Sequence, residues 1–161
     1  QLAMDLVQTA RNNQNSSIAN LQAAVKHLTL ASNVDSTKIA SLGWCFGGGQ
    51  SLQLALNSQE HPLAATILYY GTPLVTDKES LAKIKWPVLG IFGDNDEAIP
   101  ISEVNQFGTS LNQSGIKNEI DIYKGVGHAF ANPSGDNYAP KETADAWQRT
   151  LSFLKKYVVE M

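Results

Sequence analysis

Hydrophobic residues follow helical spacing in some parts of the chain and form short continuous runs in others. Helical spacing predicts an opening helix and, after the polar stretch 12–17, a second helix with Ser16 or Ser17 as its N-cap. Apolar runs of strand length are typical of strands that helices cover on both faces. The expected strands are 38–44, 63–70, 88–92 and 119–123, and the expected later helices are 47–57, 103–113 and 141–158, with a helix-to-loop segment at 78–85.

Strands alternate with helices along the chain, and this order predicts an α/β fold with a mostly parallel sheet and flanking helices. The 161 residues correspond to one domain, and no repeat, low-complexity tract or linker divides them. We therefore expect a single domain over residues 1–161. Because Gln1 falls inside the opening helix, we also expect that this domain is truncated at its N-terminus.

Composition excludes several other classes of protein. A net charge of −3 argues against a nucleic-acid partner, which needs a basic face. No apolar run approaches the roughly 20 residues that span a membrane. One cysteine cannot form an internal disulfide, and three histidines leave few ligands for a metal. We expect a cytoplasmic protein that needs neither metal nor cofactor.

The glycine-rich segment 43–49 (GWCFGGG) joins an expected strand to an expected helix, where α/β folds carry their chemistry. Its small residues suit the sharp turn of a nucleophile elbow, with Cys45 where esterases usually have serine. The helix start favours a thiolate at Cys45, and the backbone N–H of Phe46 is placed to stabilise an oxyanion. The alternative is a small buried thiol in a packing turn.

The acidic segment 93–100 (GDNDEAIP) follows the next-but-one strand and offers two carboxylates for the acid of a catalytic triad. We favour Asp96, in the outer part of the loop, over Asp94, which sits in the first turn and suits an Asx-type bond to the backbone.

A third segment, 125–130 (GVGHAF), follows the last expected strand and carries His128 between glycines that let the loop fold back over the sheet. His27 and His61 are expected to be solvated. The order nucleophile, acid, histidine, each after a strand, is that of α/β-hydrolases.

These three segments, together with Tyr69-Tyr70-Gly71, resemble the dienelactone hydrolase (carboxymethylenebutenolidase) family over roughly residues 18–157. The resemblance implies an α/β-hydrolase-type sheet. It further implies that Cys45 is the nucleophile, Asp96 the acid and His128 the general base. An acyl-enzyme at Cys45 would then be hydrolysed by a water that His128 activates.

Tyr70, Phe130 and Asn132 are the candidate substrate contacts. Family members that bind the dienelactone carboxylate use arginines, one of them at the position of Asn132, and the chain has only Arg11 and Arg149. A bidentate clamp on the carboxylate is therefore not expected. Neutral esters should compete with dienelactone.

The family's first strands precede the helix that corresponds to residues 18–31, and the resemblance covers only the later strands. The strand 38–44 would then be an open sheet edge, a feature that proteins normally cover. We expect this edge to pair with a second copy of the chain or with a missing N-terminal segment.

The resulting hypothesis is a hydrolase that cleaves a small-molecule lactone or activated ester through a Cys-His-Asp triad. Two alternatives remain open. One is a general carboxylesterase or thioesterase on the same triad, and the other is a non-catalytic fragment that binds a partner.

Overall fold

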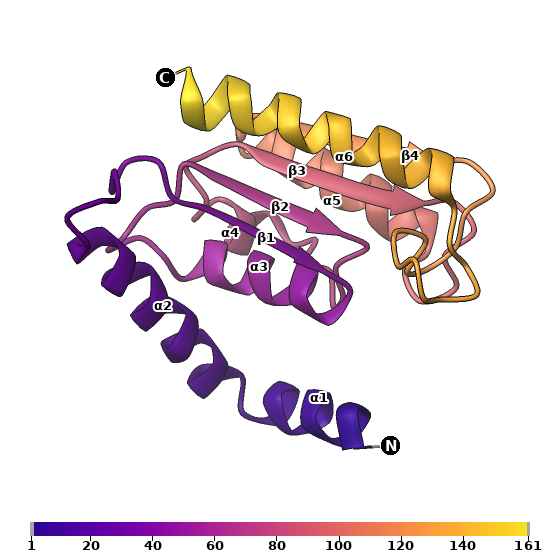
Figure 1. Ribbon diagram of the computed structural model, residues 1–161, viewed down its shortest axis with the longest axis horizontal. Helices are drawn as coiled ribbons and strands as arrows, with labels where there is room; N and C mark the ends of the chain where they lie inside the picture. Colours follow the sequence, from indigo (N-terminus) through magenta and orange to yellow (C-terminus); the bar gives the residue numbers. More distant parts are fainter. Residues whose placement is uncertain (1, 161) are drawn as a thin grey trace.

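The computed structural model describes residues 2–160 and contains a parallel sheet of four strands in the order β1-β2-β3-β4 (Figure 1). Each strand is joined to the next through a helix, and such crossovers are what parallel pairing requires. The α/β-hydrolase-type sheet with flanking helices is confirmed. The strands are β1 (Ala40–Trp44), β2 (Ala65–Tyr69), β3 (Val88–Gly93) and β4 (Asn118–Tyr123).

Helices cover both faces of the sheet. On one face the ring of Phe92 in β3 packs against Phe107 of α5, and on the other the hydroxyl of Tyr69 in β2 is 2.7 Å from that of Thr150 in α6. The helices are α1 (Leu2–Asn12), α2 (Gln14–Leu30), α3 (Phe46–Leu56), α4 (Lys78–Leu81), α5 (Ile101–Gln113), α6 (Pro140–Leu154) and the π-helix η1 (Lys155–Val159).

The hydrophobic core is centred on β2 and β3, in which every residue is buried. Burial on both faces explains why these two strands are continuous apolar runs in the sequence. The apolar side of α6 is broader than its contact with the sheet, since Trp147 and Leu151 remain more than two-fifths exposed.

Two predicted helix boundaries are wrong. The second helix begins at Gln14, and neither Ser16 nor Ser17 caps it, because the Ser17 hydroxyl instead donates to the carbonyl of Ala10. The helices α1 and α2 are thus separated by little more than a break at residue 13. The predicted final helix 141–158 leaves α geometry at Leu154 and continues as the π-helix η1.

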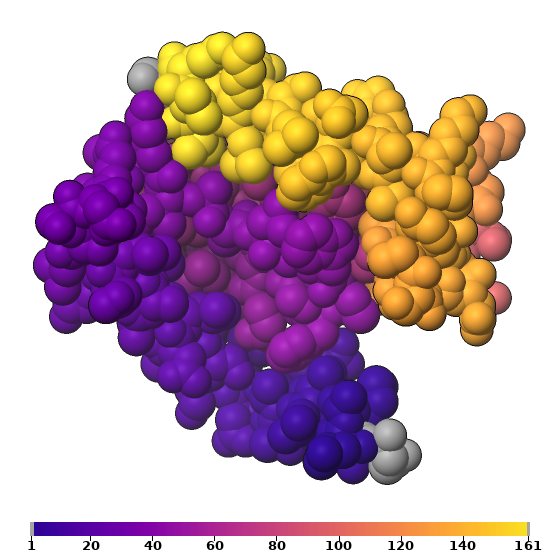
Figure 2. Space-filling model, viewed as in Figure 1, coloured from indigo at the N-terminus to yellow at the C-terminus, as the bar shows by residue number. Residues whose placement is uncertain are grey.

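Strand β1 lies at one edge of the sheet. Within residues 2–160 it pairs only with β2, and Trp44 at its end is 42% exposed. Helix α2 packs on α3, whereas α1 meets α2 end to end and extends away from the body of the molecule (Figures 1 and 2). The surface is hollowed between α1 and the segment that follows β4 (Figure 2). No helix in the described part of the chain is long and apolar enough to cross a bilayer.

Candidate active site

The turn from β1 into α3 holds Cys45 in a strained backbone conformation with φ 54° and ψ −121°. A positive φ is uncommon in a non-glycine residue. The turn is possible because glycines on either side allow close approach: a Cβ on Gly43 would lie 2.1 Å from the carbonyl oxygen of Gly47, and one on Gly48 would lie 2.7 Å from the Cα of Gly71. The local geometry is that of a nucleophile elbow.

The imidazole of His128 lies between Cys45 and Asp96. Its Nε2 is 3.1 Å from Sγ of Cys45, and its Nδ1 is 2.8 Å from Oδ2 of Asp96. Since the carboxylate can only accept, Nδ1 carries the proton and Nε2 is left to exchange a proton with the sulfur. The three side chains form one continuous hydrogen-bonded array, with the Asp96 carboxylate buried and the imidazole 23% exposed.

The two aspartates in the loop after β3 make different contacts. Asp96 is buried, and its Oδ1 accepts hydrogen bonds from the backbone N–H groups of Ala98 and Ile99. Asp94 is exposed, and its carboxylate accepts from the N–H of Gly125. The local Asx-type bond expected of Asp94 is therefore made by Asp96, and the expectation for Asp94 is wrong because its side chain reaches across to the next loop.

The histidine loop approaches the sheet closely. A Cβ on Gly93 would lie 2.1 Å from the carbonyl oxygen of Val126, and Ala129 has a φ of 61°. The ring of Tyr70 lies 5.2 Å from that of His128 and 5.5 Å from that of Phe130. The imidazole thus packs against the buried ring of Tyr70, which in turn packs against the buried ring of Phe130.

The three candidate substrate contacts lie in different surroundings. Tyr70 is buried, and burial raises the pKa of its hydroxyl to about 12. Phe130 has no exposed surface and supports the ring of Tyr70. Asn132 is exposed, and its Oδ1 accepts a hydrogen bond from the N–H of Ser134, so part of its amide is used within its own loop.

Phe46 is the first residue of α3, and the N–H groups of a first helical turn have no partner within the helix. The guanidinium of Arg11, at the end of α1, lies 5.9 Å from the centre of the Phe46 ring. Sequence reasoning missed this cation near the elbow. The position of Arg11 depends on the break between α1 and α2 at residue 13. The only indication of this break in the sequence is the polar stretch 12–17.

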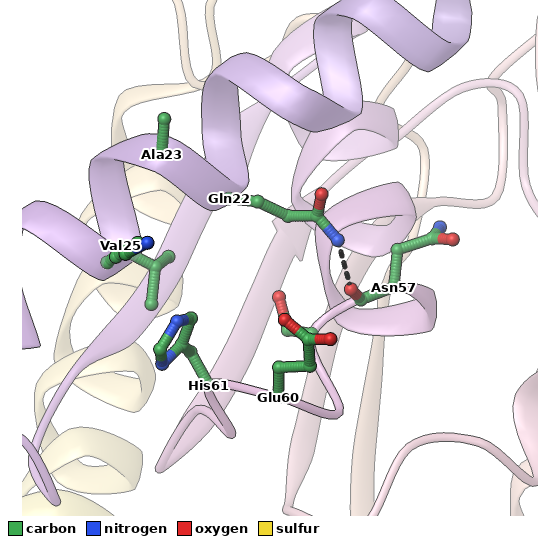
Figure 3. A pocket seen from close by; sticks show the side chains of 8 residues that line it. Gln22, Ala23, Val25, Asn57, Glu60 and His61 are labelled. Atoms are coloured by element: carbon green, nitrogen blue, oxygen red, sulfur yellow. Dashed lines mark hydrogen bonds between the residues drawn. The ribbon is translucent and has the colours of Figure 1, made fainter.

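A separate pocket of about 140 Å³ lies between α2 and the segment 57–61, at the opposite end of the strands from Cys45 (Figure 3). Gln22 donates to the backbone carbonyl of Asn57 across it, and the His61 side chain lines its floor (Figure 3). His27 is exposed on α2. Among residues 2–160, no three His, Cys, Asp or Glu side chains gather where they could hold a metal ion.

A cysteine at a strand–helix turn, with an acid and a histidine after later strands of a parallel sheet, defines an α/β-hydrolase fold. The sequence profile of the dienelactone hydrolase family matches residues 1–158. The chain belongs to the dienelactone hydrolase family.

Individual proteins agree with this assignment. A "Putative carboxymethylenebutenolidase" of Saccharolobus solfataricus is 35% identical over 154 residues, which is 90% of this chain and 54% of that protein. The crystal structure of a "Putative Dienelactone Hydrolase" from Klebsiella pneumoniae superimposes with a TM-score of 0.77 at 25% identity, covering 87% of this chain and 60% of that one.

A dienelactone hydrolase-like promiscuous phosphotriesterase from metagenomic libraries superimposes with a TM-score of 0.84 at 22% identity, covering 96% of this chain and 66% of that one, and so shares its fold. The present chain spans little more than half the length of the curated relatives it matches first.

Proposed function

We propose that this chain carries the catalytic residues of a hydrolase that cleaves a small-molecule lactone or activated ester, with Cys45 as nucleophile. The observation that carries the proposal is the unbroken array from Asp96 through His128 to Cys45, with contacts of 2.8 and 3.1 Å. A buried structural thiol would not need an oriented imidazole whose other nitrogen is held by a carboxylate.

In the first half of the reaction, Nε2 of His128 accepts the proton of the Cys45 thiol, and the sulfur attacks the carbonyl carbon of the substrate. Asp96 stabilises the imidazolium, and the backbone N–H of Phe46 donates to the oxyanion. When the tetrahedral intermediate collapses, the carbon–oxygen bond to the leaving group breaks and Nε2 donates its proton to that oxygen. A thioester on Cys45 remains.

In the second half, Nε2 of His128 accepts a proton from water, and the resulting hydroxide attacks the thioester carbonyl. Collapse breaks the carbon–sulfur bond, releases the carboxylic acid and returns the proton to the sulfur. One water is consumed for each ester bond cleaved. Tyr70 and Asn132 are the proposed walls of the substrate site, because the Tyr70 ring adjoins His128 and Asn132 follows His128 on the same loop. Phe130, predicted as a third substrate contact, has no exposed surface and packs behind Tyr70.

A general carboxylesterase or thioesterase is the second candidate. It is favoured by Asn132, which is uncharged and bonds to Ser134 within its own loop. This position therefore offers no cationic group that would require a carboxylate on the substrate, and a neutral acyl group can bind there.

We also propose that β1 takes a further strand on its free side, from a second copy of the chain or from a segment of a longer protein. Strand β1 has a partner on one side only within residues 2–160, and the matched part makes up only 54% of the first curated relative. An exposed edge of unpaired backbone groups is a template for strand addition.

The test of the proposed hydrolase is turnover of p-nitrophenyl acetate, with mass spectrometry of the quenched enzyme to detect an acetyl group on Cys45. His128→Ala should abolish turnover, whereas His61→Ala is a matched control at the far end of the strands. Absence of both turnover and acetylation in the wild type would favour a non-catalytic binding role and overturn the proposal.

A further inference from the structure

The backbone around His128 is held by a side chain from later in the same connection between β4 and α6. Nδ2 of Asn137 donates a hydrogen bond of 2.9 Å to the backbone carbonyl of His128. That carbonyl belongs to the peptide group that joins His128 to Ala129. The next dihedral angle along the chain is the positive φ of Ala129, 61°. Alanine rarely adopts such a value unless the surroundings impose it.

The segment that carries Asn137 is itself anchored to the residues after His128. The N–H of Asn132 donates to the carbonyl of Ala129 at 2.9 Å, and the N–H of Ala139 donates to the carbonyl of Phe130 at 2.9 Å. The hydroxyl of Thr143 in α6 donates to the same Phe130 carbonyl at 3.0 Å. The backbone that carries Asn137 is therefore fixed by hydrogen bonds on both sides of this residue.

Asn137 also lies beside Gly127. A Cβ on Gly127 would lie 3.5 Å from Nδ2 of Asn137, an ordinary van der Waals distance, and a tighter 3.2 Å from the carbonyl oxygen of Asn95. Asn137 itself is exposed, and its replacement leaves no cavity in the core. Its hydrogen bond within the described residues goes to His128 and to neither Cys45 nor Asp96.

We propose that Asn137 is a positioning residue for His128. By fixing the peptide group between His128 and Ala129, it keeps Ala129 in the left-handed region and thereby keeps the imidazole within reach of Asp96 and Cys45 at once. Without this bond, Ala129 can relax to a negative φ, which turns the carbonyl and displaces the ring from one of its two partners. The inference rests on the proposed function of the triad.

The test compares Asn137→Ala and Asn137→Asp with wild type. Alanine removes the donor, and aspartate keeps the shape but presents only acceptor oxygens to the carbonyl. Both variants should lower kcat for p-nitrophenyl acetate about five- to tenfold with little change in KM, the size expected for one lost hydrogen bond. Alkylation of Cys45 by iodoacetamide should slow to a similar extent. Asp136→Ala is the matched control, since the Asp136 side chain makes no hydrogen bond within residues 2–160.

A second substitution separates positioning from folding. Glycine adopts a positive φ without strain, so Ala129→Gly combined with Asn137→Ala should recover several-fold of the lost kcat and alkylation rate. A loss below twofold in both Asn137 variants, an equal loss in Asp136→Ala, or no recovery with glycine would overturn the inference. If the wild type hydrolyses no ester, the proposed function fails, and the alkylation rates still decide whether Asn137 positions His128 against Cys45.

Discussion

The carboxylate of Asp94 accepts a hydrogen bond of 2.6 Å from the backbone N–H of Gly125, and this bond joins the loop after β3 to the loop after β4. Two residues further on, Asp96 contacts His128 on the second of these loops. Neighbouring aspartates thus hold one loop in two ways: Asp94 holds its backbone, and Asp96 holds the imidazole.

Exchanging each aspartate for asparagine should separate these roles. Asp96→Asn offers an amide to Nδ1 of His128 and favours the wrong tautomer, which by analogy with serine triads should lower kcat by up to about four decades. Asp94→Asn keeps an acceptor for Gly125 and should cost less than about 1 kcal/mol of unfolding free energy, with little change in kcat. Ester turnover and urea unfolding of both variants check this. The reverse ranking in kcat would move the acid to Asp94.

Replacement of Cys45 tests the nucleophile directly. Cys45→Ala should lose ester hydrolysis and acetylation, because no other cysteine is present in the chain. Cys45→Ser should retain part of the activity, since the same elbow presents a hydroxyl to Nε2 of His128. Wild-type turnover in the alanine variant would show that Cys45 is a packing residue.

Substrate preference should reflect the uncharged amide at Asn132. A lost charge-assisted contact is worth roughly 1.5–3 kcal/mol, so the kcat/KM of dienelactone should stay within about a hundredfold of that of a neutral short-chain ester. Arg11 is exposed near Phe46, and Arg11→Gln should lower the dienelactone value by less than about fivefold and leave the neutral ester unchanged. A larger preference that disappears in Arg11→Gln would identify this arginine as the carboxylate clamp.

Tyr70 should make the fold sensitive to alkali. Burial raises the pKa of its hydroxyl from 10.0 to about 12. Between these values Tyr70 ionises in the unfolded chain before it does so in the folded one, so stability is full below pH 10 and falls as the pH rises toward 12. Tyr70→Phe should reduce this loss, measured as the change in urea midpoint across that range, at a cost of about 1 kcal/mol near neutrality. Tyr138→Phe, at an exposed position, is the control and should leave the alkaline loss as large as in the wild type.

The free edge of β1 should cause self-association. Light scattering after size-exclusion chromatography should give a mass above the 17.4 kDa of one chain. Leu42→Lys introduces a charge on the edge strand and should shift the protein toward monomer, whereas Leu30→Lys, at an exposed position at the end of α2, should not. A monomeric wild type would contradict pairing with a second copy and leave a segment of a longer protein as the partner of β1.

Much of the fold was predictable because it depends on local patterns. The buried runs at β2 and β3 are apolar on both faces, so their type and parallel pairing follow from the order of strands and helices. The elbow was equally predictable, since only glycines tolerate the approaches seen at Gly43 and Gly48. The start of α2 at Gln14 and the change to π geometry after Leu154 were not predictable, because helix boundaries shift by a residue or two with local hydrogen bonds such as that of Ser17 to Ala10.

The sequence by itself determined the order of the elements, the cysteine at a strand–helix turn and the presence of an acid and a histidine after later strands. Only the tertiary structure decided which aspartate holds His128, that Arg11 lies near Phe46 and that Asn137 bonds to the His128 backbone. These three contacts join residues that are between nine and 35 positions apart in the chain, and they depend on how the segments that carry them pack against one another. Periodicity and turn propensity act over a few residues, so they place a side chain on a loop but leave its direction to the packing of the whole chain.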